Sequence, residues 1–155
     1  MEYCKIDNTY IVRIFKDEEI TEKIKELCKK ENIKLGTITG IGATNDVEIG
    51  LYDTDNKKYY TNNLVGMYEI TSLLGNITTK DDEPYLHIHI TVADLNNYVY
   101  GGHLTKCIIS ATAEIFINVI DGNINRRYDG IIGLNLMEIH NENKWFWFWI
   151  TRTLN

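Results

Sequence analysis

Three of the four histidines in this chain fall within one stretch, LHIHITVADLNNYVYGGHL, residues 86–104. His87 and His89 lie two positions apart, and His103 follows a polar turn region. Imidazole nitrogens bind zinc, nickel, copper and iron. Three protein ligands with an open fourth position are typical of catalytic zinc sites. The pattern therefore predicts a metal site wherever the fold brings the three rings together.

The residues around His87 and His89 alternate between aliphatic and polar, which predicts a β-strand with two different faces. His87 and His89 lie on the polar face, away from the aliphatic core. The aliphatic face holds Leu86, Ile88, Ile90 and Val92.

A hairpin centred on Asn96 would place His103 directly opposite His89, with Cβ atoms about 5 Å apart. His87 is the next residue on that face, so the three imidazoles would converge. Gly101 and Gly102 would allow a close backbone approach or a bulge beside His103. The alternative is that these histidines are structural, since a strand histidine is usually a hydrogen-bonding surface residue. His140, in the polar segment HNENK, is interpreted as a surface residue without a role in the site.

The remaining patterns predict one helix and several strands. The segment from about 18 to 31 has a helical apolar stripe, Asp17 as a candidate N-cap, and Lys29 and Lys30 near its end. Elsewhere the period is two, and Asp121-Gly122 and Asp129-Gly130 are hairpin signals. This combination predicts an α+β single domain with a largely antiparallel or mixed sheet and one main amphipathic helix. The helical stripe consists of Ile20, Ile24, Leu27 and Cys28; the strand faces include Val47, Ile49 and Leu51, and Ile109, Ala111, Ala113, Ile115, Ile117 and Val119.

Composition limits the classes of function. The chain has 155 residues, a net charge of −6 and a pI of about 5.2, which disfavours binding to phosphate backbones. Its three cysteines include no CxxC pair, so neither a thiolate zinc site nor a disulfide framework is predicted. The N-terminus does not resemble a signal peptide, and the longest apolar run, WFWFWI, is too short to cross a bilayer. We therefore expect a cytoplasmic protein without membrane contact.

The order and spacing of several motifs resemble the PPC family, the plant and prokaryote conserved domain. The match covers about residues 11–137 and includes TGIGAT at 39–44, GMYEITSLLGN at 66–76, HIH at 87–89 and GGHL at 101–104. It continues with TAEIFI at 112–117 and RRYDGIIGL at 126–134. We accordingly assign residues 1–140 to a PPC-like domain and residues 141–155 to a C-terminal tail of undetermined role.

The resemblance implies a homotrimer whose clustered histidines, here His87, His89 and His103, are metal ligands, with zinc as the default ion. Plant relatives carry DNA-binding AT-hooks and use the segment matching Gly66–Thr71 for partner contact. This sequence has no Arg-Gly-Arg-Pro hook, which together with its negative charge weakens a DNA-binding prediction. The alternative to a metal protein is a protein-interaction or DNA-binding, transcription-related module with structural histidines.

Two carboxylates fall within the family-like segments. Glu69 is a candidate metal ligand or general base, and Glu114 is a weaker one. The alternative is that both carboxylates are held by backbone amides or by Arg126. Arg126 and Asp129 are predicted to stabilise the last turn, and no substrate follows from any of these residues. The aromatic tail segment from Trp145 to Trp149 would pack on the domain or on a neighbouring subunit.

Overall fold

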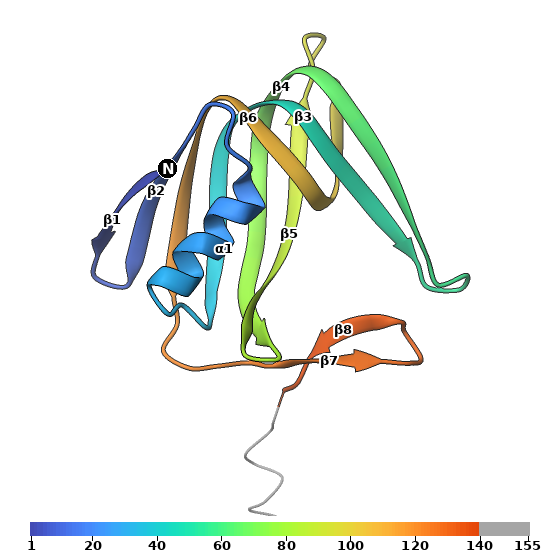
Figure 1. The fold of residues 1–155 in the computed structure, drawn as a ribbon. Coiled ribbons are helices and arrows are strands. Elements are labelled where there is room, and N and C mark those ends of the chain that lie inside the picture. Colours follow the sequence, from blue (N-terminus) through green and yellow to red (C-terminus); the bar gives the residue numbers. More distant parts are fainter. Residues whose placement is uncertain (140–155) are drawn as a thin grey trace, which may run out of the picture.

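The computed structural model describes residues 1–139 of the 155-residue chain. His140 and the aromatic segment from Trp145 to Trp149 lie outside the described residues. The described part is an α+β domain dominated by antiparallel sheet with one main helix, as the sequence predicted (Figure 1). Its elements are β1 (Glu2–Ile6), β2 (Thr9–Phe15), α1 (Ile20–Lys30), β3 (Gly36–Asp53), β4 (Lys58–Lys80), β5 (Glu83–Ala93), β6 (Val99–Val119), β7 (Arg126–Asp129) and β8 (Leu134–Met137).

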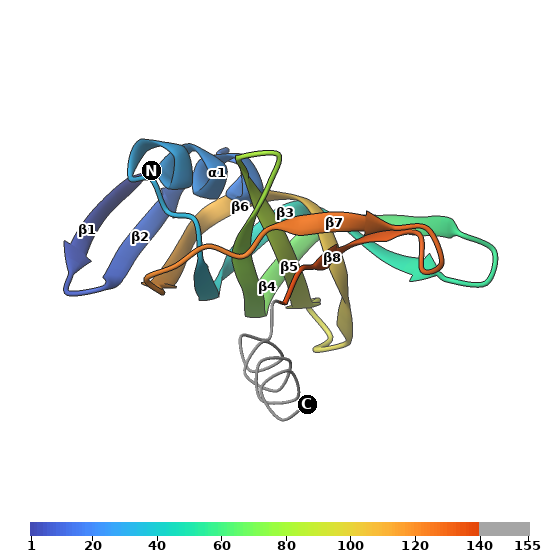
Figure 2. The same ribbon diagram turned by 90° about the horizontal axis from the view of Figure 1, so that it is seen from below.

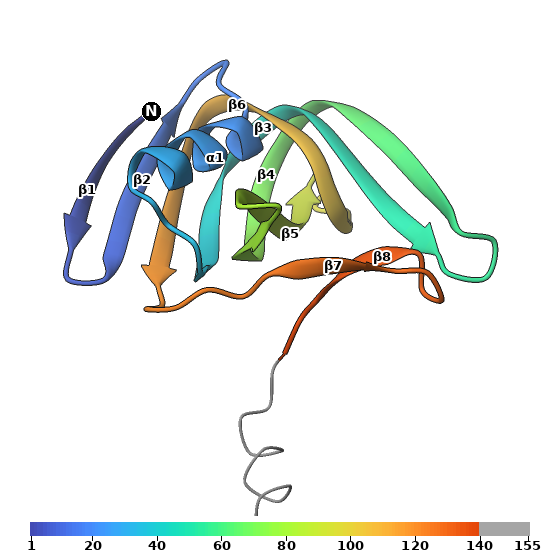
Figure 3. The same ribbon diagram turned by 60° about the horizontal axis from the view of Figure 1, so that its bottom comes forward.

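The main sheet curves until two of its strands meet. Its order is β1-β2-β6-β3-β4-β5, and the start of β6 pairs with β5 as well. Strands β3, β4, β5 and β6 therefore enclose a space, and the sheet forms the arch seen in Figure 3. Beyond Gly50, β3 no longer pairs with β6, and the far ends of β3 and β4 continue past the arch as a hairpin (Figure 1). We call this hairpin, residues 51–60, the β3–β4 arm.

Helix α1 packs its apolar stripe against β5 and β6, and all four predicted stripe residues are buried. It begins two residues later than predicted because Glu19, not Asp17, is the N-cap. The Glu19 carboxylate accepts a hydrogen bond from the Glu22 amide at 2.7 Å. Asp17 has a left-handed backbone with φ of 68°, and its amide donates to the Ile109 carbonyl at 2.8 Å. Asp17 is thus part of the loop entering the helix.

The predicted strand faces are mostly correct, and two exceptions have physical causes. Ala111 is exposed although its neighbours Ile109 and Ala113 are buried, because the β3–β6 register shifts between these two positions. Leu51 is 68 % exposed because it lies on the β3–β4 arm, beyond the core that holds Val47.

The last two strands form a separate hairpin that runs beneath the arch, visible from below in Figure 2. The Asp121-Gly122 prediction was wrong: no hairpin forms there, because β7 pairs with β8 and not with β6. Asp129-Gly130 does form a turn, as predicted. The Asp129 carboxylate accepts hydrogen bonds from the amides of Ile131 and Ile132, each at 2.9 Å.

Within residues 1–139, no helix has both the length and the apolar character that a membrane span requires.

Candidate metal centre

The turn between β5 and β6 sets the register of the histidines. Asp94 organises it, because its carboxylate accepts hydrogen bonds from the amides of Asn96 at 2.8 Å and Tyr98 at 3.0 Å. Asn97 adopts a left-handed conformation with φ of 64°, which asparagine tolerates better than most residues. The predicted hairpin centred on Asn96 is thereby confirmed.

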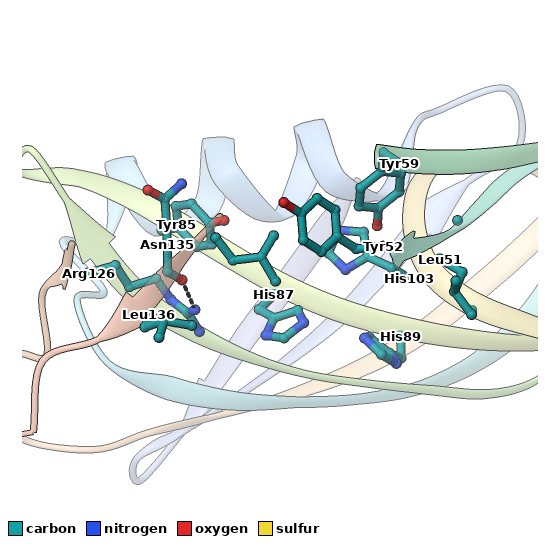
Figure 4. A pocket seen from close by; sticks show the side chains of 13 residues that line it. Leu51, Tyr52, Tyr59, Tyr85, His87, His89, His103, Arg126, Asn135 and Leu136 are labelled. Atoms are coloured by element: carbon teal, nitrogen blue, oxygen red, sulfur yellow. Dashed lines mark hydrogen bonds between the residues drawn. The ribbon is translucent and has the colours of Figure 1, made fainter. Parts of the chain in front are cut away.

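The three imidazoles converge as predicted. His89 on β5 is the direct cross-strand partner of His103 on β6, and His87 follows on the same face of β5. Ring centroids are 5.2 Å apart for His87–His89, 5.3 Å for His87–His103 and 5.6 Å for His89–His103. One ligand nitrogen from each ring lies within 4.8 Å of the other two. Figure 4 shows the three rings along one wall of a cavity.

Glycine allows β6 to approach β3 beside the cluster. A Cβ atom on Gly102 would lie 2.8 Å from the carbonyl oxygen of Gly50, closer than real Cβ contacts. Gly50 is the β3 partner of His103, and the β3–β6 register shifts just beyond it, between Glu48 and Ile49. The predicted close approach beside His103 is confirmed, and it allows His103 to lie between β3 and β5.

Burial keeps the imidazoles of His87 and His103 neutral. Desolvation, followed by repulsion from His87 and His89, lowers the pKa of His103 to about 4. Desolvation also lowers the pKa of His87, with further contributions from the Arg126 charge and from His89. Neutral imidazole is the form that binds a metal, so at pH 7 these two rings are ready to act as ligands.

The donor set fits a transition metal. Tetrahedral ligands about 2.1 Å from zinc lie about 3.4 Å from one another, so small side-chain rotations must shorten the longest nitrogen–nitrogen separation. None of the other residues that line this cavity is a carboxylate or a thiol. The cluster therefore offers three nitrogen ligands and leaves further coordination positions open to the cavity.

The cavity has a volume of about 370 Å³, within the usual range for small-molecule sites. Aromatic side chains form much of its wall, and Tyr59 meets the His103 ring edge-on at a centroid distance of 5.8 Å. Sequence reasoning did not predict these wall residues, because they come from the β3–β4 arm, β5 and β8. They are Leu51, Tyr52, Tyr59, Tyr85, Leu134, Asn135 and Leu136.

Arg126 is the permanently charged residue of the cavity wall. The sequence assigned it a role in the last turn or in holding the two candidate carboxylates. It does bind the final hairpin, since Nη1 donates to the Asn135 carbonyl oxygen at 2.8 Å. It also lies in the wall and stacks over Tyr85, with its guanidinium carbon 4.8 Å from the ring centroid. The sequence offers no signal that separates the adjacent residues Arg126 and Arg127, because they differ only in burial: Arg126 is buried and Arg127 is exposed.

The two candidate carboxylates lie elsewhere. Glu69 is exposed on β4 opposite Ala93, four residues along β5 from His89, and does not line the cavity. Glu114 is exposed on β6 opposite Arg13. Neither carboxylate bonds to Arg126, whose hydrogen bonds go to Thr78, Asn76 and Asn135. The structure thus brings the histidines together without either glutamate.

The chain is similar to a known protein family and to several solved structures. Residues 1–121 match the family described as the Plants and Prokaryotes Conserved (PCC) domain. A PPC protein from Pyrococcus horikoshii is 35% identical, with a TM-score of 0.80 and coverage of 90% of this chain and 95% of that one. A candidate DNA-binding protein from Bacteroides thetaiotaomicron is 33% identical, with a TM-score of 0.87 over 88% and 96% of the two chains. A metal-containing protein from Archaeoglobus fulgidus is 30% identical, with a TM-score of 0.81 over 89% and 97%.

Two curated relatives are named bifunctional protein GlmU and come from Synechococcus strains. One is 26% identical over 110 residues and the other 24% identical over 136 residues. The aligned regions cover 70% and 86% of this chain but only 16% and 20% of those proteins. This chain therefore spans no more than about a fifth of the length of the curated relatives it matches.

Proposed function

The chain belongs to the Plants and Prokaryotes Conserved domain family, and from that premise we propose that it binds one divalent metal ion through His87, His89 and His103. The observation that carries the proposal is the direct pairing of His89 with His103, with the third ring on the same strand face. The 30% identical metal-containing protein from Archaeoglobus fulgidus gives additional support. Zinc is the expected ion, since it favours few ligands and an open position.

A divalent ion held by three imidazoles supplies Lewis acidity at its open coordination positions. This chain's own residues contribute the rest of the site. The imidazoles of His87 and His103 are kept neutral by burial, and aromatic side chains line the cavity beside them. A small molecule bound there would meet both the ion and Arg126.

Metal analysis of the purified protein tests this function. After growth with zinc and purification without chelators, we expect about one equivalent of metal per chain. His89→Ala is the informative variant, since His89 is exposed and its loss should spare the core. His140→Ala is the matched control and should keep its metal. A metal content below about a tenth of an equivalent in the parent protein would exclude the site.

The proposed assembly is a homotrimer in the cytoplasm, and the proposed partner surface is the segment Gly66–Thr71. Met67 in that segment is 68 % exposed and its neighbour Val65 72 %, which suits contact with another protein surface. The free state of all three cysteines agrees with a reducing compartment. Pull-down with parent protein and a Met67→Lys variant tests the segment, because a buried charge at the contact should abolish capture.

DNA binding is the competing function, suggested by the description of the Bacteroides thetaiotaomicron relative. The net charge of −6 opposes it, as does the lack of an AT-hook. We expect no complex in a gel shift at about 50 mM salt, where electrostatic binding is strong. A complex whose affinity falls steeply with added salt would favour DNA binding over the metal function.

A further inference from the structure

Within residues 1–139, Arg126 is a buried cation without an acidic partner. It is 6 % exposed, and its Nε donates to Thr78 Oγ1 at 2.8 Å, while Nη2 donates to Asn76 Oδ1 at 2.9 Å. Its third acceptor, the Asn135 carbonyl oxygen, is also neutral. No Asp or Glu among residues 1–139 forms an ion pair with it. Burying a charge against neutral groups alone is costly, so this arrangement needs a reason.

The acceptors place Arg126 beside the histidines. Asn76 on β4 is the direct cross-strand partner of His87, and Thr78 is the partner of Tyr85. The guanidinium bonds to both β4 residues and so lies next to these two pairs, which are successive pairs on one face of the sheet. The close-up shows Arg126, His87 and His89 following one another along the same wall (Figure 4).

The charge of this cavity is opposite to that of the whole chain. None of the residues that line it is acidic, although the chain carries a net charge of −6. The three imidazoles are uncharged ligands in their metal-binding form, so they would leave the charge of a divalent ion uncompensated. Arg126 adds a permanent positive charge next to them. Such a site attracts anions.

Two N–H groups of the guanidinium are not used by the hydrogen bonds described above. Of its five N–H groups, three are used by Thr78, Asn76 and Asn135, which leaves one on each Nη atom. Those three bonds and the stacking on Tyr85 fix its plane, so little side-chain entropy remains to be lost on binding. A fixed planar fork matches the two oxygens of a carboxylate or a phosphoryl group.

We propose that Arg126 and the histidine cluster form one composite site for a small ligand bearing an oxyanion, a carboxylate or a phosphoryl group, which Arg126 binds. The contact with the ion deepens the proposed metal function and rests on it. The contact with Arg126 does not, because the guanidinium is held by protein groups alone. The cavity volume of about 370 Å³ restricts the ligand to a small molecule.

The first test follows the arginine side chains in the metal-free, full-length chain. Sodium acetate or sodium phosphate is titrated into ¹⁵N-labelled protein, with sodium chloride at equal ionic strength as control, and the Nε–H resonances are recorded. We expect a saturable shift at Arg126 with at least one of the two anions. Arg127 is the internal control, since its side chain is 81% exposed and paired with Glu138. No shift at Arg126, or an equal shift at Arg127, would overturn the proposal.

Substitution of Arg126 tests whether its planar pair of N–H donors binds the anion. Arg126→Lys keeps a positive charge but loses the planar pair of donors, so anion affinity should fall about tenfold or more. Arg127→Lys should bind as the parent does. If Arg126→Lys does not fold, the titration of the parent protein decides alone. Acetate and phosphate distinguish the two ligand classes: whichever saturates at the lower concentration identifies the group that the site prefers.

A second titration, with and without zinc, distinguishes this proposal from the proposed metal function. Acetate is titrated into zinc-loaded chain and into the His89→Ala variant, with metal content measured on the same samples. We expect zinc to tighten acetate binding in the parent protein only. Zinc uptake without anion binding would leave the metal function standing and overturn the composite site. Anion binding without zinc uptake would support the Arg126 subsite and contradict the metal function.

Discussion

Each histidine of the cluster has a different environment, and this difference determines its chemistry. His89 is exposed, whereas His87 and His103 are partly buried beneath the aromatic wall. Burial of a titratable ring disfavours its charged form. Protonation therefore favours the unfolded chain, and the free energy of unfolding falls when the pH becomes low enough to protonate these rings. The consequence is measurable without any metal.

Metal-free protein should lose stability as the pH falls from about 6.5, the ordinary histidine value, towards 4. The folded-state pKa of His103 is depressed to about 4, so in this window the unfolded chain binds more protons than the folded chain. The contribution is therefore complete above the unfolded pKa and declines through the window. Urea unfolding at several pH values measures it.

A His103→Gln variant should show a flatter pH dependence between 6.5 and 4.5 than the parent protein, and His140→Gln, outside the cluster, serves as the control. Carboxylates with lowered pKa values, such as Glu18 and Glu31, add their own acid sensitivity only at lower pH. Identical profiles for parent and His103→Gln would contradict the assigned cause.

The three thiols should differ in reactivity. Burial raises the pKa of Cys28 and of Cys107 to about 12, while Cys4 is exposed. Because the thiolate is the nucleophile, a disulfide reagent at pH 8 should modify only Cys4 in the native protein and all three cysteines after denaturation. Cys4→Ser should abolish the native reaction. Rapid labelling of Cys28 in folded protein would show that the helix opens readily.

Among the elements, the β5–β6 hairpin carries the site and its closure against β3 holds it in place. His103 pairs with His89 on one side and with Gly50 on the other, so one strand connects both halves of the arch. This double pairing depends on the absence of a side chain at Gly102, whose added Cβ would lie 2.8 Å from a backbone oxygen.

Gly102→Ala should therefore destabilise the protein by about 1–3 kcal/mol and weaken metal binding, because β6 must move away from β3. Gly130→Ala is the matched control, since a Cβ there meets no atom within 4 Å. Thermal unfolding and metal titration of both variants measure the effect. Equal stability of the two variants would show that the strands can separate at no cost.

For the whole molecule, the curvature of the sheet leaves apolar side chains uncovered along β3 and β4. Leu51, Val65 and Met67 are each at least 68 % exposed. Exposed apolar surface of this kind usually marks an interface, and the family resemblance supplies the number three.

Light scattering at micromolar concentration should give about 54 kDa, corresponding to three chains of 18.0 kDa. The trimer should persist after deletion of residues 144–155, because the uncovered surface lies on β3 and β4. Met67→Lys places a charge on that surface and should shift the mass towards one chain. A stable 18 kDa species in the parent protein would contradict the assembly.

The sequence by itself determined the elements and the histidine register. Alternation along β5 separates His87 and His89 from the aliphatic core, and the polar turn around Asn96 places His103 opposite His89. The helical stripe was equally readable, since period and burial are local properties. These features depend on neighbours in the chain, which a single sequence displays.

Tertiary structure alone decided what surrounds the histidines. Arg126 lies beside His87 because the final hairpin passes beneath the arch instead of pairing with β6, and the Asp121-Gly122 signal predicted the opposite path. Two of the aromatic wall residues, Tyr52 and Tyr59, lie on the β3–β4 arm, whose direction depends on the curvature of the sheet. Such contacts join residues some fifty positions apart, as Arg126 and Asn76 show, and no local pattern encodes them.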